Sequence, residues 1–160
     1  MVQTIYTVGH NSLNLMQFVS LLQVNKITHI VDVRSIPYSK YALWSDKSRI
    51  AELLRPFKIN YTYLGHKLGG KKKEIGRISK QQRVTPEDLY NQGIRALLQL
   101  SMRDNLAILC AEGDPAKCHR QHVIAQTLLE SNAQVLHILK DGSTKTAWKE
   151  DKPVVQETLF

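Results

Sequence analysis

The stretch Leu106-Ala107-Ile108-Leu109-Cys110-Ala111-Glu112-Gly113-Asp114-Pro115-Ala116-Lys117-Cys118-His119-Arg120 carries the most information about fold and function. Its apolar start predicts a buried strand, and Asp114-Pro115 is a helix-start signal. The stretch also holds both cysteines of the chain, two acids, a histidine and an arginine. A strand that runs through a polar loop into a helix N-terminus is where α/β proteins bind anions and carry out chemistry. This stretch therefore predicts an α/β fold and a functional site.

The rest of the chain alternates between predicted strands and predicted helices. Runs rich in β-branched and apolar residues predict strands over residues 4–8, 29–34, 60–64, 106–110 and 134–139. Helix-start signals at Asn14, at Ser45 or Asp46, at Thr85 and at Asp114 precede apolar residues at helical spacing. This order predicts one α/β domain over residues 1–160, three-layered and Rossmann-like. Its mostly parallel five-stranded sheet should have helices on both faces.

Two segments depart from this alternation. Residues 66–84 hold seven basic residues and one acid, in a chain whose formal net charge is +8. We predict a basic loop insertion there, which attracts polyanions or steers anionic ligands toward a cleft. The alternative is a solvated surface loop that aids solubility. Residues 143–160 lack a clear period and predict an irregular C-terminal tail.

Composition excludes several classes of protein. No apolar run approaches the roughly 18 residues of a membrane span, and the first residues do not resemble a signal peptide. Two cysteines in 160 residues do not make a disulfide framework. We therefore expect a cytoplasmic protein with no membrane partner.

Polar residues follow several predicted strands, and parallel strands place their carboxyl ends at one edge of a sheet. We therefore predict one cleft that binds an anionic small molecule or nucleic acid. The candidates for nucleophile or general acid and base are Cys110, Glu112, Asp32, His10 and His119. The candidates for substrate binding are Arg34, Gly69, Gly70, Lys71, Lys72, Lys73, Cys118 and Arg120.

Several of these residues also have a structural interpretation. Asp32 could cap the turn after its strand and pair with Arg34, and Cys110 could be an inert core thiol. His29 and His137, inside apolar strands, are predicted to be structural.

A metal site is a further alternative. Cys118 and His122 share a face of the predicted helix, and Cys110 could join them. Their spacing matches no common zinc pattern, so we predict neither a metal nor a cofactor.

Four segments resemble the signature blocks of domain-of-unknown-function family 488: residues 6–12 (YTVGHNS), 31–37 (VDVRSIP), 64–70 (LGHKLGG) and 109–120. The resemblance extends from about Thr4 to Leu139, and residues 110–120 match the pattern C-A-E-x-x-P-x-x-C-H-R in full. The family's first block reads G-H-S, whereas Asn11 separates the histidine from the serine here. The resemblance implies a fold rather than a reaction, because the family is named for having no established activity.

A more remote similarity links the strand-end Cys110 to the rhodaneses. Rhodaneses and related phosphatases place an arginine roughly five or six residues after the cysteine, whereas position 116 is alanine and the next arginine is Arg120. This similarity therefore remains an analogy. From the residues of the predicted cleft we predict an enzyme, a cysteine-dependent transferase or hydrolase, that acts on a nucleotide or nucleic acid. The alternatives are a non-catalytic nucleic-acid-binding module and a rhodanese-like sulfurtransferase.

Overall fold

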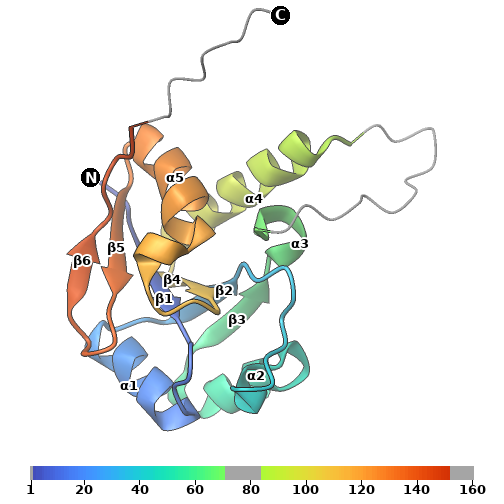
Figure 1. Cartoon of the computed structure of the whole chain (residues 1–160), viewed down its shortest axis with the longest axis vertical. Coiled ribbons are helices and arrows are strands. Elements are labelled where there is room, and N and C mark those ends of the chain that lie inside the picture. The colour runs from blue at the N-terminus through green and yellow to red at the C-terminus, as the bar shows by residue number, and fades with distance from the viewer. Residues whose placement is uncertain (1, 71–83, 152–160) are drawn as a thin grey trace, which may run out of the picture.

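The computed structural model describes residues 2–70 and 84–151, which form a six-stranded sheet of order β3-β2-β4-β1-β5-β6 (Figure 1). The strands are β1 (Thr4–Gly9), β2 (His29–Asp32), β3 (Asn60–Tyr63), β4 (Leu106–Cys110), β5 (Gln134–Ile138) and β6 (Thr144–Thr146). The first five pair in parallel, and β6 pairs antiparallel with β5. The predicted three-layer, mostly parallel α/β fold is confirmed, with one strand more than expected.

The additional strand lies in the segment predicted to be an irregular tail. Gly142, with φ of +88°, makes a tight turn after β5, and the Leu139 N–H donates to Ser143 O across it. Strand β6 is three residues long and exposed throughout. A strand with no buried face has no apolar alternation, so the sequence carried no signal for it. Residues 152–160 of the predicted tail lie outside the described residues.

Helices cover both faces of the sheet (Figure 1). Helices α1 (Leu15–Val24) and α2 (Lys47–Leu54) pack on one face. Helix α4 (Pro86–Ser101), the short α3 (Gly65–Leu68) and α5 (Gln126–Glu130) pack on the other. Three predicted N-caps are confirmed, since Asn14, Asp46 and Thr85 each accept a backbone N–H of the following helix. Residues 66–68 of the predicted loop over residues 66–84 belong to α3, and residues 71–83 of it lie outside the described residues.

The burial pattern of the strands explains these layers. Neighbouring residues of a strand point to opposite faces, so Val31 joins the core under α4 while Ile30 joins the core under α1 and α2. The same alternation separates Ile108 from Leu109 in β4. Each central strand is therefore buried on both sides, as a parallel sheet requires.

The connections create a crevice at the carboxyl ends of the strands. From β1 and β2 the chain continues into α1 and α2 on one face, whereas from β4 it continues toward α5 on the other. Strand β4 lies between β2 and β1, so the chain leaves neighbouring strand ends toward opposite faces. Such a point is where open α/β sheets bind ligands. No helix among residues 2–70 and 84–151 combines the length and apolar character that a membrane crossing requires.

Candidate functional site

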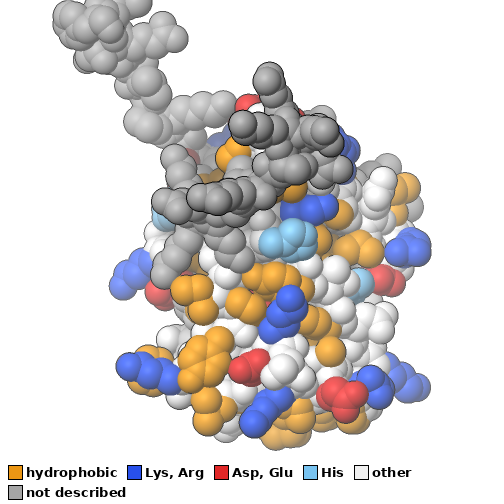
Figure 2. All heavy atoms as spheres, turned by 90° about the vertical axis from the view of Figure 1, so that its right-hand side faces the viewer, with side chains coloured by type: hydrophobic (Ala, Val, Ile, Leu, Met, Phe, Trp, Pro, Cys, Tyr) orange, Lys and Arg blue, Asp and Glu red, His pale blue; other side chains and the backbone are white. Residues whose placement is uncertain are grey.

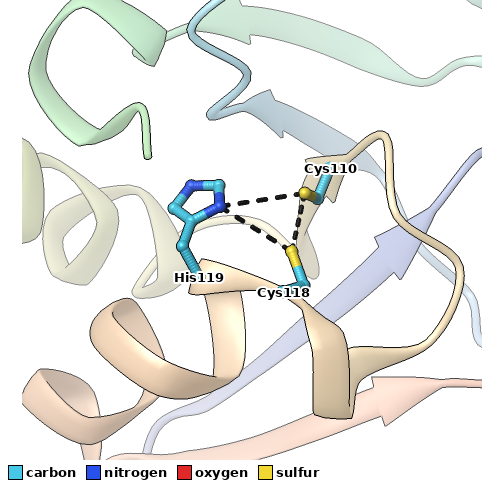
Figure 3. Close-up of side chains that lie close together, drawn as sticks. All are labelled: Cys110, Cys118 and His119. Carbon is cyan, nitrogen blue, oxygen red and sulfur yellow. Dashed lines mark hydrogen bonds between the residues drawn. The ribbon is translucent and has the colours of Figure 1, made fainter. Parts of the chain in front are cut away.

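The site is centred on a cluster of Cys110, Cys118 and His119 (Figure 3). Cys110 Sγ and Cys118 Sγ are 2.7 Å apart, and both are free cysteines. His119 Nδ1 lies 3.9 Å from Cys110 Sγ and 3.7 Å from Cys118 Sγ. The three side chains point toward one another from the end of β4 and the segment before α5. Sequence analysis predicted all three as site residues, and the fold brings them together.

Cys118 reaches the cluster because the helix predicted from Pro115 is interrupted. Asp114 caps a single 3-10 turn, Pro115–Lys117, by accepting the Ala116 N–H. Cys118 then takes an extended conformation, with φ of −125° and ψ of 143°. A π-helical segment, Arg120–Ala125, follows and continues into α5. Cys118 therefore lies between two helical segments and turns back toward β4, contrary to the expected continuous helix.

The interruption also takes Cys118 out of the helix that carries His122, although the His122 N–H still donates to Cys118 O at 3.2 Å. His122 Nδ1 contacts Glu150 Oε1 at 2.6 Å, and its Nε2 contacts the Ala116 carbonyl at 2.6 Å. The shared helix face considered for these two residues is absent, and His119 takes the third place in the cluster instead.

Hydrogen bonding makes the two thiols unequal. The thiolate of Cys110 is stabilised first by its hydrogen bond to Cys118, then by those to His119 and to the Glu112 backbone N–H. These bonds outweigh burial and lower the pKa of Cys110 below that of a free thiol. The same bond to Cys110, together with burial, raises the pKa of Cys118. The contacts thus act in opposite directions on the two thiols, lowering the pKa of Cys110 and raising that of Cys118.

Arg120 places a positive charge behind the cluster. Its side chain is fully buried, and its Nη2 donates to Gly113 O at 3.0 Å. Among the described residues no atom accepts a hydrogen bond from its Nε or Nη1. Burial lowers the pKa of Arg120, and the two cysteine sulfurs are the strongest charges that oppose this effect. A buried guanidinium is favoured by nearby negative charge, and the two sulfurs, followed by Glu112 and Asp114, are the groups that would supply it.

The second predicted group, Asp32 and Arg34, forms a closed structural network. Arg34 Nε donates to Asp32 Oδ1 at 2.9 Å and its Nη2 to Oδ2 at 2.7 Å. Ser45 accepts from Arg34 Nη1 with Oγ at 3.0 Å and from Nη2 with its carbonyl at 2.6 Å. Tyr61 OH completes the shell of Asp32 with a bond of 2.6 Å to Oδ2.

His10 uses the remaining donor of Arg34. The distance from Arg34 Nη1 to His10 Nε2 is 3.3 Å, and His10 Nδ1 faces the Asn11 carbonyl at 3.1 Å. Because arginine only donates, Nε2 must accept and Nδ1 must carry the proton. Burial, together with the charge of Arg34, lowers the pKa of His10 against the opposing effect of its bond to the Asn11 carbonyl. All five N–H donors of Arg34 thus have partners, which favours the structural interpretation of this group.

A cleft of about 340 Å³ connects the two groups at the carboxyl edge. Cys110 and His119 line it together with Arg34, Ser35, Ile36, Tyr38, Gly70 and Ala111. Gly70 packs directly on the imidazole, since a Cβ there would lie 3.0 Å from His119 Cγ. Gly69, its neighbour, packs in the same way against Ser35. The predicted binding residues Lys71, Lys72 and Lys73 lie outside the described residues.

Glu112 follows Cys110 by two residues in the sequence, but its side chain is exposed to solvent. Its Oε1 accepts the Asp114 N–H at 3.0 Å, which stabilises the loop after β4. Its carbonyl packs against Gly9, where a Cβ would overlap the Glu112 oxygen. The adjacent His10 N–H donates to Cys110 O at 3.0 Å. Gly9 therefore allows the end of β1 to approach the loop after β4 closely.

The cluster also has the composition of a metal-binding site. Its two sulfurs and the His119 Nδ1 lie within 4.8 Å of one another. Two thiolates and an imidazole suit zinc, although a tetrahedral ion would need a fourth ligand as well.

Sequence analysis missed several residues of the Asp32–Arg34 network. Ser45 was considered only as a helix cap, and Tyr61 only as a strand residue. Tyr63 was missed as well, and its OH donates to Arg34 O at 2.8 Å. Tyr61 and Tyr63 are two residues apart on β3, which pairs with the strand that carries Asp32, and this spacing was the sequence signal that could have indicated their contact with the network. The structural roles predicted for two histidines are confirmed. His29 bonds to Asp104 and Thr62, and His137 bonds to Thr7 and Gln121.

Comparison with known proteins identifies the family. The family model described as "Domain of unknown function DUF488" matches residues 14–128, well over half of the chain. The chain belongs to the DUF488 family. No curated protein and no solved structure gives a significant match. The DUF488 match spans β2, β4 and the whole Cys110–Cys118–His119 cluster, so the site described above belongs to the family domain.

Proposed function

We propose that this DUF488 protein is a cysteine-dependent transferase or hydrolase that acts on an anionic substrate, with Cys110 as the nucleophile. One observation carries the proposal. Cys110 lines a cleft at the carboxyl edge of the sheet and is hydrogen-bonded to Cys118 and His119. The thiolate is the reactive form of cysteine, and these contacts lower the pKa of Cys110.

His119 is the candidate general acid or base. It lines the cleft beside Cys110, with its Nδ1 on the sulfurs. Among the described residues no group bonds to its buried Nε2. An imidazole so placed can give a proton to a leaving group or take one from an attacking water or alcohol. His10, by contrast, is bonded at both ring nitrogens, to Arg34 and to the Asn11 carbonyl, and Asp32 is occupied by Arg34 and Tyr61.

The anionic character of the substrate rests on charge and on the rim of the cleft. The chain has a formal net charge of +8, and Lys71, Lys72 and Lys73 directly follow the cleft residue Gly70 in the sequence. Ile36 and Tyr38 line the cleft and are 55% and 56% exposed. An exposed aromatic and an apolar side chain beside basic residues suit the ring and the phosphates of a nucleotide.

The surface on the side of α2 and α3 also supports a nucleotide or nucleic acid as the substrate. The loop between β2 and α2 lies on the side of the molecule that carries α2 and α3 (Figure 1). Figure 2 shows hydrophobic and basic side chains side by side on that side. In the loop, Tyr41 and Leu43 are also exposed, and Lys40 lies over the Tyr41 ring at 5.2 Å. Bases of a nucleotide chain stack on such surfaces while lysines contact the phosphates.

A sulfurtransferase is the second candidate, supported by the strand-end position of Cys110. In that reaction the Cys110 thiolate would take a sulfane sulfur from a donor, form a persulfide, and pass the outer sulfur to an acceptor thiol. Thiosulfate consumption that requires Cys110 but is unaffected by nucleotides would favour this candidate.

The proposal is tested by alkylation of Cys110 with neutral iodoacetamide in the presence of anions. We expect Cys110 to react faster than Cys118, and faster than either cysteine in the urea-unfolded chain at neutral pH. Pyrophosphate, a nucleoside triphosphate or a single-stranded oligonucleotide should slow the reaction, whereas an uncharged nucleoside should not. The Cys110→Ser variant is the matched control for labelling at Cys118. Equal and slow labelling of both cysteines, unaffected by any anion, would refute the proposal.

A further inference from the structure

The structure gives Cys118 no role in the proposed function beyond its hydrogen bond to Cys110. Cys118 is 3% exposed and is not among the residues that line the cleft. Its sulfur nevertheless lies 2.7 Å from Cys110 Sγ, so the two sulfurs need only a short approach to reach the roughly 2.05 Å of a disulfide bond. Both residues are free thiols held in this position by separate backbone segments, the end of β4 and the extended residue before the π-helical segment. The two sulfurs are thus placed for a reaction with each other.

We propose that Cys110 and Cys118 form a dithiol–disulfide couple that reduces anionic disulfides, with Cys110 attacking the substrate and Cys118 resolving the mixed disulfide. This inference rests on the reactive Cys110 of the proposed function and adds a second activity to the same cleft. It also predicts that oxidation to the disulfide removes the nucleophile and reversibly inactivates any other reaction of Cys110.

The proposed reaction consists of two thiol–disulfide exchange steps, in which atoms and electrons balance. First, the Cys110 thiolate attacks one sulfur of the substrate, the substrate S–S bond breaks, and one thiolate leaves. Second, Cys118 loses its proton and attacks Cys110 Sγ, the mixed disulfide breaks, and the second thiolate leaves. The Cys118 proton ends on a leaving thiolate. The protein, which starts as one thiolate and one thiol, loses two electrons and forms one S–S bond, and the substrate gains two electrons as one thiolate and one thiol. A second dithiol in solution returns the protein to its reduced form.

The geometry assigns the order of attack. Cys110 lines the cleft and is the sulfur that a substrate meets, whereas Cys118 lies behind it. His119 Nδ1 lies 3.7 Å from Cys118 Sγ and 3.9 Å from Cys110 Sγ, so the imidazole borders both sulfurs between which the exchange takes place. Arg120, buried behind the pair without another partner for its Nε and Nη1 among the described residues, favours whichever cysteine carries the negative charge.

The test uses DTNB, an anionic aromatic disulfide that releases one coloured thiolate for each exchange. With the fully reduced chain at neutral pH we expect two equivalents of the coloured thiolate. The protein product should carry no adduct and should have lost about 2 Da, the mass of two hydrogens. The second equivalent should appear at a rate independent of DTNB concentration, because it is released within the molecule. Peptide mapping should find Cys110 bonded to Cys118.

The Cys118→Ala variant is the matched control. It should release one equivalent and keep a stable adduct on Cys110. A wild-type product that keeps its adduct on Cys110 while Cys118 stays free would overturn the resolving role and leave the proposed nucleophile intact. Failure of Cys110 to react in both proteins would instead remove the proposed function itself. A stoichiometric zinc ion in the purified protein that blocks both thiols until it is chelated would also overturn the couple.

Discussion

Replacing Arg34 separates a structural role for the Asp32–Arg34 pair from a ligand-binding one. In Arg34→Met, the carboxylate of Asp32 would remain fully buried and lose two of its charged hydrogen bonds. Removing one partner of a buried ion pair costs about 3–5 kcal/mol, because the other charge stays desolvated. The bonds from Arg34 to Ser45 and His10 would be lost as well. A domain of this size has a total stability of roughly 5–15 kcal/mol, so the loss is a large fraction of it.

Equilibrium urea unfolding measures this loss. With a typical slope of about 2 kcal/mol per molar urea, we expect the midpoint to fall by about 2 M. Arg55→Met is the matched control, because Arg55 forms its ion pair with Glu52 in solvent and the two side chains are 75% and 72% exposed. That variant should lose less than about 1 kcal/mol. The double variant Asp32→Leu with Arg34→Met should recover part of the loss, because it leaves no unpaired buried charge.

Anion protection of Cys110 gives the second readout for Arg34. If the pair is structural, the folded fraction of Arg34→Met or of the milder Arg34→Lys should still show slower Cys110 alkylation with pyrophosphate. A stability loss below about 1 kcal/mol, combined with loss of that protection, would show that Arg34 binds ligand and that the structural interpretation is wrong.

Three further predictions concern other parts of the molecule. Burial lowers the pKa of His137 to about 4, so the unfolded chain binds more protons than the folded one between about pH 6.5 and 4. The free energy of unfolding should therefore decrease as the pH is lowered from about 6.5 to about 4, and it should decrease less steeply in His137→Gln. Gly9→Ala should destabilise the fold by about 1–3 kcal/mol in urea and slow Cys110 alkylation, because its Cβ meets the Glu112 backbone; an unchanged midpoint would contradict this contact. Replacing Lys71, Lys72 and Lys73 with glutamine should change stability by less than about 0.5 kcal/mol. If these lysines contact nucleic acid, the slope of log affinity against log salt should shrink by up to about 0.9 per lost contact; an unchanged slope would exclude that role.

The sequence was sufficient to place Asp32, Arg34 and Cys110 at one edge of a parallel sheet. Strand ends are marked by apolar runs that stop at polar residues, and Gly9, Asp32 and Cys110 all follow that pattern. Parallel pairing then brings them together, because β4 lies between β1 and β2. This part of the prediction rests on local patterns and on one general rule of sheet topology.

What the sequence could not show are the side-chain partners and the path of the chain after the first helical turn. The Asp114–Pro115 start signal is satisfied by one 3-10 turn, and only tertiary packing decides that the helix stops at Cys118. The occupation of all Arg34 donors depends on Ser45, eleven residues further along the chain. The burial of Arg120 depends on the loop carbonyl of Gly113 and on the close approach of Gly9. Long-range contacts of this kind leave no periodic signal.

The ultraviolet absorbance of thiolates, followed across pH, tests most directly whether Cys110 is ionised. We expect the wild-type protein to hold one thiolate at neutral pH and to lose it only well below the value of about 8.5 for a free thiol. Cys110→Ser should lack this signal. Cys118→Ala should shift it toward higher pH, because the hydrogen bond to Cys118 is the largest stabilising contact of the thiolate. A wild-type protein that shows no thiolate until the pH approaches about 8.5 would contradict the activated Cys110 on which the proposed function depends.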